Sequence, residues 1–329
     1  MDLAFCDRND AAQSYVGWLK GFAGDQTDLF APDMIFLPGN HDHSLWTAAR
    51  MAAEEASVSA GGDARMPLCT PAVSGKALPT AMVSGLNRMA GFSGEVELRY
   101  PNFALHDPSS GRCVAFHHGH FLESTYRAMS FAHDMLTGVA RLHLTAAQLS
   151  DENANWIDFG WSSFGQSSDL SRDVVTLYSG LSVSSEAHHL RQRMARAIAK
   201  NIAPKLPMGG QDRMRTALRY GILAALDASF GAFSDEERAS ISHVMSESGI
   251  AGLRAYIDGP LAGQLREELG HIPPELTFVF GHTHKPFADA LVPGKGPVVQ
   301  LCNTGGWYLD SPRLNGREGV SLVLVDDAL

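Results

Sequence analysis

Several features that mark particular classes of protein are scarce in this chain of 329 residues. No apolar stretch approaches the ~18 residues that a membrane helix needs. No basic segment followed by an apolar one marks the N-terminus for secretion. The cysteines are far apart and form no C-x-x-C pair, which indicates small apolar fillers in a reducing compartment. These absences favour a cytoplasmic location. The four cysteines are Cys6, Cys69, Cys113 and Cys302.

Basic charge is also in short supply. The chain has 26 lysines and arginines against 36 aspartates and glutamates, a formal net charge of −10. A nucleic-acid-binding surface would be basic, so this balance argues against one. The hydrophobic content of 45% and the charged content of 19% are typical of a soluble globular protein. An acidic protein can still bind a phosphate ester where metal cations dominate the local field.

One stretch near the N-terminus combines a strand pattern with metal-binding side chains. Residues 34–37 (Met-Ile-Phe-Leu) predict a short buried strand, and Pro38-Gly39 ends it. Residues 40–43 (Asn-His-Asp-His) follow, and their side chains can bind a metal, hydrogen-bond an anion or carry a proton. In an open α/β sheet, ligands bind just beyond the carboxyl ends of the strands. Alone, this stretch would indicate no more than a polar turn.

Two later stretches repeat this pattern. The apolar residues 113–116 precede His-His-Gly-His at 117–120, and the apolar residues 276–280 precede Gly-His-Thr-His-Lys-Pro at 281–286. Neutral imidazole suits zinc, manganese and iron, and a carboxamide oxygen is an acceptable partner. Glycine lets the backbone turn sharply and approach an ion or a phosphate closely. Three histidine clusters at three strand ends therefore predict a metal site.

These clusters resemble the last three signature blocks of the calcineurin-like metallophosphoesterases. The matching blocks are Gly-Asn-His-Asp at 39–42, His-Gly-His at 118–120 and Gly-His-Thr-His at 281–284. The resemblance implies an α/β fold in which a two-sheet β-sandwich is flanked by helices. It also implies two divalent metal ions (Mn, Fe or Zn) at the strand ends. Its extent is residues 1–125 and 271–329, which leaves residues 126–270 as a helical insertion or cap.

The resemblance assigns a role to each matching residue. Asn40, His118 and His282 would bind one metal ion, and His284 would bind the other. His41 would be the catalytic residue that helps the leaving group depart.

Four further residues are expected around the ligands or the substrate. Asp42 could hold the imidazole of His41 in position. His43 and His120 flank predicted site residues. Asn303 begins an Asn-Thr-Gly-Gly-Trp loop at 303–307, similar to one in some bacterial members of the family.

The first two blocks of the family pattern, D-x-H and G-D-x-x-D, are not found in their expected setting. Residues 24–28 spell Gly-Asp-Gln-Thr-Asp, but they follow an amphipathic helix predicted for about 11–22 and no apolar strand precedes them. The alternative to a G-D-x-x-D block at 24–28 is that the chain as numbered begins late. Asp2 would then be the second aspartate of G-D-x-x-D, and the bridging ligand would lie before residue 1. Either way, the second metal site is expected to be incomplete in this chain.

Other segments give simpler predictions. Residues 95–100, 103–106, 298–302 and 320–325 predict strands, and a helix is expected to begin at Ser44. The insertion shows helical periodicity at 213–231, a capping box at 234–237 and an aromatic loop at 156–169.

The sequence supports two functional hypotheses. The first is an enzyme that hydrolyses a phosphate ester by means of a metal-bridged hydroxide. The second is a non-catalytic scaffold or interaction protein of the same fold, without a complete dinuclear site. The histidines and Asn40 favour the enzyme, because a scaffold has no physical need for them, whereas the missing D-x-H favours the scaffold.

Overall fold

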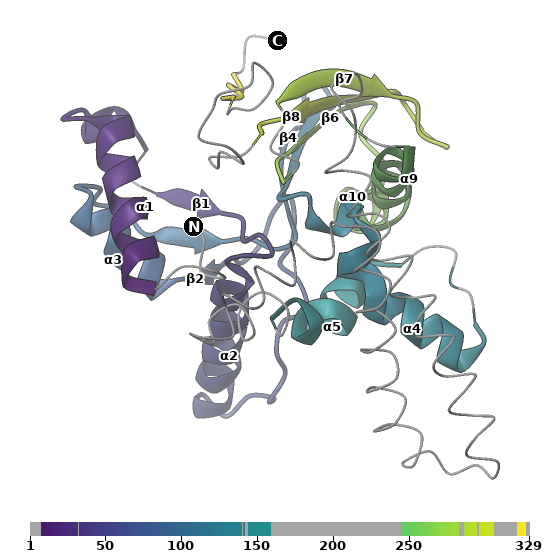
Figure 1. The fold of residues 1–329 in the computed structure, drawn as a ribbon, viewed down its shortest axis with the longest axis horizontal. Coiled ribbons are helices and arrows are strands. Elements are labelled where there is room, and N and C mark those ends of the chain that lie inside the picture. Colours follow the sequence, from purple (N-terminus) through teal and green to yellow (C-terminus); the bar gives the residue numbers. More distant parts are fainter. Residues whose placement is uncertain are drawn as a thin grey trace, which may run out of the picture.

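The computed structural model describes residues 8–31, 33–139, 141, 144–158, 245, 247–282, 286–294, 296–305 and 321–326. Within these residues the protein is a mixed α/β structure with a three-stranded sheet, a five-stranded sheet and several helices (Figure 1). None of the helices in this part of the chain is long and apolar enough to cross a membrane.

The smaller sheet contains the strand that leads to Asn40. Its strands lie in the order β1 (Met34–Phe36), β3 (Val96–Leu98) and β2 (Leu78–Pro79), with β1 parallel and β2 antiparallel to β3. Two helices, α1 (Arg8–Ala23) and α3 (Ala81–Met89), lie beside this sheet (Figure 1). Their shared apolar cluster consists of Val16, Leu19, Ala23, Leu86, Ala90 and Phe92.

The larger sheet brings the other two histidine-bearing segments together. Its strands lie in the order β4 (Asn102–Asp107), β5 (Arg112–His117), β6 (Glu275–Phe280), β8 (Val299–Asn303) and β7 (Phe287–Leu291). The three central strands are parallel, and the two edge strands are antiparallel to their neighbours. The last residues of the central strands are register partners, His117 with Phe280 and Phe280 with Asn303. All three strands therefore deliver the residues that follow them to one edge of the sheet.

Helices surround the two sheets (Figure 1). Their bounds are α2 (His43–Ser59), α4 (Ala128–Thr137), α5 (Ala146–Ile157), α9 (Glu247–Tyr256), the π-helical turn η6 (Ile257–Leu261) and α10 (Ala262–Leu269). Two short 3-10 helices, η2 (His120–Leu122) and η3 (Ser124–Arg127), connect β5 to α4. The main apolar core joins Trp46 of α2, Leu149 of α5, Leu253 of α9 and Phe278 of β6, all of which are buried.

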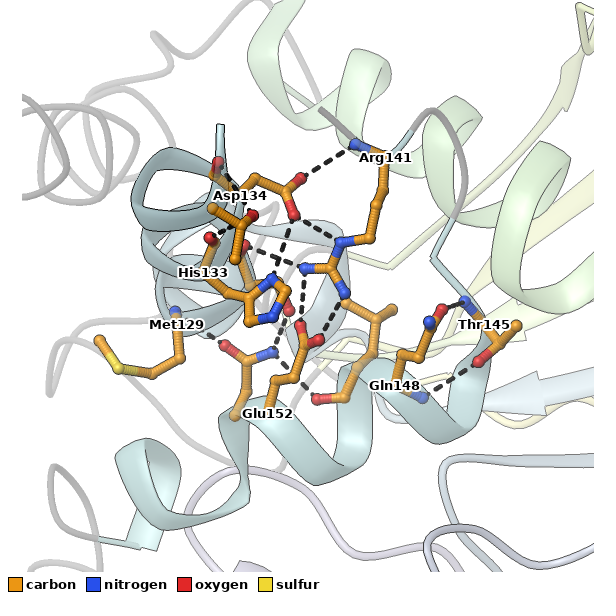
Figure 2. Close-up of polar contacts among 11 residues, drawn as sticks. Met129, His133, Asp134, Arg141, Thr145, Gln148 and Glu152 are labelled. Carbon is orange, nitrogen blue, oxygen red and sulfur yellow. Dashed lines mark hydrogen bonds and ion pairs between the residues drawn. The ribbon is translucent and has the colours of Figure 1, made fainter. Parts of the chain in front are cut away.

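The connection between α4 and α5 is held by one arginine (Figure 2). The guanidinium of Arg141 donates to Asp134 and Glu152 and, over 3.2 Å, to the carbonyl oxygen of Ser130. Partial burial opposes ionisation of both carboxyls, but the hydrogen bonds from Arg141 outweigh it and lower the pKa of each. The next residues, Thr145 and Gln148, form a capping box that starts α5.

Most of the predicted elements are confirmed. The helix expected at 11–22 is α1, and the strands expected at 34–37, 95–100, 103–106, 113–116, 276–280 and 298–302 are β1, β3, β4, β5, β6 and β8. The helix expected at Ser44 begins one residue earlier, at His43. The predicted helix at 213–231 and the capping box at 234–237 lie outside the described residues.

Two predictions are wrong. Residues 321–326 form no strand, although 320–325 reads as one. The segment starts beside the larger sheet, where the backbone N–H of Ser321 donates to the carbonyl oxygen of Thr304 over 2.8 Å. It then leaves the core, and Leu324 is 91% exposed, so its apolar residues are not used to pair a strand. Trp156 belongs to α5 rather than to an aromatic loop, as does Ile157, and residues 159–169 of that loop lie outside the described residues.

Candidate metal centre

The three sequence blocks meet at the carboxyl ends of β1, β5 and β6. Asn40 follows β1, His118 follows β5 directly, and His282 follows β6 after one glycine. The backbone N–H of Gly281 donates to the carbonyl oxygen of His118 over 3.0 Å, so the loops after β5 and β6 are joined to each other.

The side chains of Asn40, His118 and His282 converge. Nε2 of His118 lies 3.1 Å from Oδ1 of Asn40, and the rings of His118 and His282 are 5.2 Å apart between centroids. His282 adopts a φ of 73°, a left-handed conformation that costs a non-glycine residue about 1–2 kcal/mol. Such strain persists only where the surroundings impose it, and it is often found at functional sites. The three side chains that the sequence predicts to converge are thus close together in the structure.

Two glycines make the close approach possible. A Cβ atom on Gly39 would stand 2.5 Å from Nε2 and 2.6 Å from Nδ1 of His118, so the imidazole lies directly on the backbone of the first block. Gly119 has a φ of 120°, and a Cβ there would meet Cβ of His282 at 2.7 Å. Each glycine thus leaves room for a histidine from another strand.

His118 is held in its neutral form. Burial lowers the pKa of its imidazole well below the usual value, and the nearby His282, His117 and His41 lower it further. Neutral imidazole is the form that binds a metal ion. His41 follows Asn40 directly and is half-buried.

Two residues that the sequence did not indicate contact the outer atoms of this trio. Nδ2 of Asn40 donates to the hydroxyl of Tyr126 over 2.8 Å, and Nε2 of His282 lies 2.9 Å from Oε1 of Glu123. Tyr126 is buried, and the Glu123 side chain is 14% exposed. Both follow the His-Gly-His block within eight residues. No motif or periodicity marks them, because their role depends on how the chain turns after His120.

Asp42 has a contact that differs from the expected one. Its Oδ1 accepts a hydrogen bond of 2.5 Å from the backbone N–H of Gly39. The carboxylate therefore closes the turn that carries Asn40 and His41. It is buried, with 6% of its surface exposed.

His43 contacts the end of α5 and the apolar core. It is fully buried, and its Nδ1 lies 2.8 Å from Oδ1 of Asp158, whose Oδ2 accepts a 2.6 Å hydrogen bond from the hydroxyl of Thr47. Its ring packs edge-on against Tyr100 at 5.3 Å. These contacts tie the start of α2 to the end of α5.

His120 and His117 lie beneath the trio in the core. Nε2 of His120 is 3.0 Å from the hydroxyl of Tyr100, and Nδ1 of His117 accepts from the backbone N–H of Gly119 over 2.8 Å. Burial lowers the pKa of both imidazoles, that of His117 to about 3. The ring of His120 lies 5.6 Å from that of His118 and 5.7 Å from that of Tyr126. His120 thus packs in the core beside His118 and Tyr126.

Asn303 ends β8 at the same sheet edge. Its Oδ1 accepts a 2.8 Å hydrogen bond from the backbone N–H of Gly305, and the residue is 1% exposed. This contact shapes the loop after β8, which lies next to Gly281.

The G-D-x-x-D spelling at 24–28 lies elsewhere. It follows α1, and the residues just after it contact the segment before β3: the rings of Phe30 and Phe92 are 5.8 Å apart, and Asp33 accepts from the backbone N–H of Glu95 over 3.4 Å. Because β1 and β3 are parallel, these contacts are at their amino ends, opposite to Asn40. His284 and Asp2, expected to be ligands of the other ion, lie outside the described residues.

The donor set fits one divalent ion. Two imidazoles and a carboxamide oxygen suit zinc, manganese or iron, and a carboxylate and a hydroxyl contact the outer atoms of His282 and Asn40. Across the described part of the chain, no group of three or more His, Cys, Asp or Glu side chains could hold a metal.

Comparisons with protein-family models, with curated proteins and with solved structures gave no match to this chain.

Proposed function

We propose that this protein is a metal-dependent phosphoesterase of the calcineurin-like metallophosphoesterase fold. One observation carries the proposal: Oδ1 of Asn40 and Nε2 of His118 are 3.1 Å apart, and the ring of His282 lies beside them. Three side chains of metal-binding type, from three strand ends, then lie next to one another. A protein that used these sheets only for binding partners would not need this arrangement.

The fold part of the proposal rests on the layout of the sheets. Two sheets with flanking helices are present, and Asn40 follows a strand of one sheet while His118 and His282 follow strands of the other. The site thus lies where the ends of the two sheets meet. Residues 128–157 and 247–269 contribute helices but no strand, as the proposed insertion between the two parts of the core requires.

In this proposal the chain holds and orients the reacting groups. Asn40, His118 and His282 hold one ion, and His284 contributes to a second. When bound, the two ions activate water and neutralise charge on the phosphate oxygens. His41 lies one residue beyond Asn40 and donates a hydrogen bond or a proton to the departing ester oxygen. The bond between Asp42 and Gly39 fixes the turn that presents both residues.

The second candidate function is a non-catalytic interaction protein of the same fold. It is favoured by the position of Asp25, which lies at the opposite end of the smaller sheet from Asn40. In the described part of the chain, Glu123 is the carboxylate seen at the trio, and it contacts the outer nitrogen of His282.

The test combines metal content with hydrolysis. The 329-residue chain is incubated with Mn²⁺ or Zn²⁺, desalted and analysed for bound metal, and then assayed on nitrophenyl phosphate and bis(nitrophenyl) phosphate. We expect one well-held ion per chain and metal-dependent hydrolysis, with both lost in Asn40→Ala and His118→Ala. His271→Ala is the matched control, because this histidine is exposed and lies outside the site.

The outcomes separate the two candidates. Bound metal with no hydrolysis of either ester would reject the enzyme and retain the metal centre. No bound metal and no hydrolysis would favour the interaction protein. Equal metal content in His118→Ala and His271→Ala would reject the assignment of the ligands.

A further inference from the structure

The turn after the His-Gly-His block folds back over the candidate ligands. Within it, the backbone N–H of Leu122 donates to the carbonyl oxygen of Gly119, and that of Glu123 donates to the carbonyl oxygen of His120, each over 3.0 Å. Glu123 therefore lies at the end of a hydrogen-bonded turn that begins at the site itself. The following 3-10 helix, η3, carries Tyr126.

The contact between Glu123 and His282 selects one ring nitrogen for the metal. Oε1 of Glu123 is 2.9 Å from Nε2 of His282, and an ionised carboxylate can only accept a hydrogen bond. In the neutral form of the ring, Nε2 therefore carries the hydrogen and the lone pair is on Nδ1. A carboxylate on the outer N–H also raises the basicity of a ligating imidazole and fixes its orientation.

Tyr126 orients the side chain of Asn40 in a similar way. An asparagine amide can present its oxygen or its nitrogen, and only the oxygen binds a cation. Because Nδ2 donates to the Tyr126 hydroxyl over 2.8 Å, Oδ1 is turned toward His118. The Tyr126 ring also lies edge-on to that of His282, at 5.4 Å. Tyr126 thus contacts two of the three ligands.

The segment that carries both residues is itself held rigidly. Phe121 and Leu122 are buried in the main core with Leu253 and Tyr256 of α9. Gly252 of α9 packs so closely that a Cβ atom there would overlap the carbonyl oxygen of Leu122. A mobile loop could not hold two ligands in register, whereas a packed one can.

From these contacts we infer that Glu123 and Tyr126 are positioning residues of the metal centre: Glu123 directs Nδ1 of His282, and Tyr126 directs Oδ1 of Asn40, toward one divalent ion. The inference deepens the proposed function and rests on it. Neither residue belongs to the sequence blocks, since both come from the turn that leads into the proposed insertion.

The first measurement is metal affinity. Wild-type chain, Glu123→Gln, Glu123→Ala and Tyr126→Phe are titrated with Zn²⁺ and Mn²⁺ in competition with a chromophoric chelator. Loss of such an outer partner typically weakens metal binding about 10- to 100-fold. We expect Glu123→Ala to show the largest loss. Glu123→Gln should be intermediate, because its amide oxygen can still accept from Nε2.

Matched controls separate this role from general damage. Glu95→Gln removes an exposed carboxylate that pairs with Arg88 on the surface. Tyr256→Phe removes a buried tyrosine hydroxyl that donates to Asn102 over 2.9 Å. Both should keep the wild-type affinity, although Tyr256→Phe is expected to lower the melting temperature at least as much as Tyr126→Phe.

The second measurement follows the tautomer without metal. Long-range ¹H–¹⁵N correlation spectra distinguish imidazoles protonated at Nε2 from those protonated at Nδ1. We expect His282 of the metal-free wild type to carry its hydrogen on Nε2 and Glu123→Ala to show a mixture of both forms. A change in stability alone would not move this signal.

Each outcome has a definite meaning. Unchanged affinity in Glu123→Ala and Tyr126→Phe, with metal bound by the wild type, would overturn the positioning roles and leave the proposed function intact. Complete loss of binding in Glu123→Gln would overturn the role of Glu123 by making it a ligand. A wild-type chain that binds neither metal would overturn the proposed function and the inference together.

Discussion

Replacing Gly39 with alanine should separate the proposed metal centre from the fold that supports it. The new Cβ atom would lie 2.5 Å from Nε2 of His118, where unstrained carbon contacts are roughly 3.5 Å. The imidazole must therefore move by about 1 Å. Its 3.1 Å approach to Asn40 cannot survive that shift unchanged. Overpacking of this kind costs about 1–3 kcal/mol of stability, and a 1 Å displacement of a positioned group can cost about 10²-fold in turnover.

The assay compares chemical unfolding, metal affinity and hydrolysis for Gly39→Ala and a control glycine. Gly17 lies in the middle of α1 with open space around its Cβ position, so Gly17→Ala should raise the free energy of unfolding by about 0.5–1 kcal/mol. The two substitutions are chemically identical and should have opposite effects on stability. Wild-type metal affinity in Gly39→Ala would refute the reasoning, because the ring of His118 would then not be held against this backbone as the structure shows.

Three further predictions address the segment that carries Glu123 and Tyr126, the chemistry of the site, and the connection between α4 and α5. Gly252→Ala should push α9 away from the carbonyl of Leu122 and lower both metal affinity and melting temperature; a lowered melting temperature with unchanged affinity would show that the turn keeps its place without α9. His41→Ala should keep its metal but lose about 10²–10⁴-fold in hydrolysis of alkyl phosphate esters, and far less with nitrophenyl esters, whose leaving group needs little assistance. Equal losses on both esters would argue against a leaving-group role. Arg141→Met should lower the melting temperature at pH 7. The pKa values of its two carboxyl partners are lowered in the folded state, so their stabilisation is complete above their unfolded values of about 4 and is lost as the pH falls through the lowered values. The difference from wild type should therefore narrow below about pH 4 and close only below the folded pKa values. Arg65→Met is the control, because that arginine is largely exposed and its ion pair should contribute little. A difference for Arg141→Met that persisted at low pH would show that packing, rather than charge, is what the arginine supplies.

The strands and the convergence of the candidate ligands could be predicted because both depend on local patterns. Apolar runs bounded by glycine or proline are short enough to be strands and too short to be helices. Parallel strands then place their carboxyl ends at one edge, which is why His118 and His282 meet. Asn40 comes from the other sheet, so parallel pairing does not explain its place beside them, and its role as a ligand was implied only by the family resemblance.

The positioning residues could not be predicted from the sequence, because their contacts depend on the path of the chain between elements. Glu123 and Tyr126 reach the ligands only because η2 and η3 turn back over them. Nothing in the sequence distinguishes a glutamate and a tyrosine in an unpatterned stretch from ordinary surface or core residues. The same limitation explains residues 320–325, where apolar composition resembles a strand but the chain leaves the core after Ser321.

The glycines of the three blocks have a structural role that the sequence does not display. In the sequence they suggest a backbone that approaches an ion. In the structure Gly39 makes room for the ring of His118, Gly119 makes room for His282, and the N–H of Gly281 binds the carbonyl of His118. These glycines let the three loops pack on one another, and this packing brings the side chains of Asn40, His118 and His282 together. A substitution at these glycines should therefore disturb the ligands of a neighbouring block, which is a sharper expectation than loss of the residue's own contact to a phosphate.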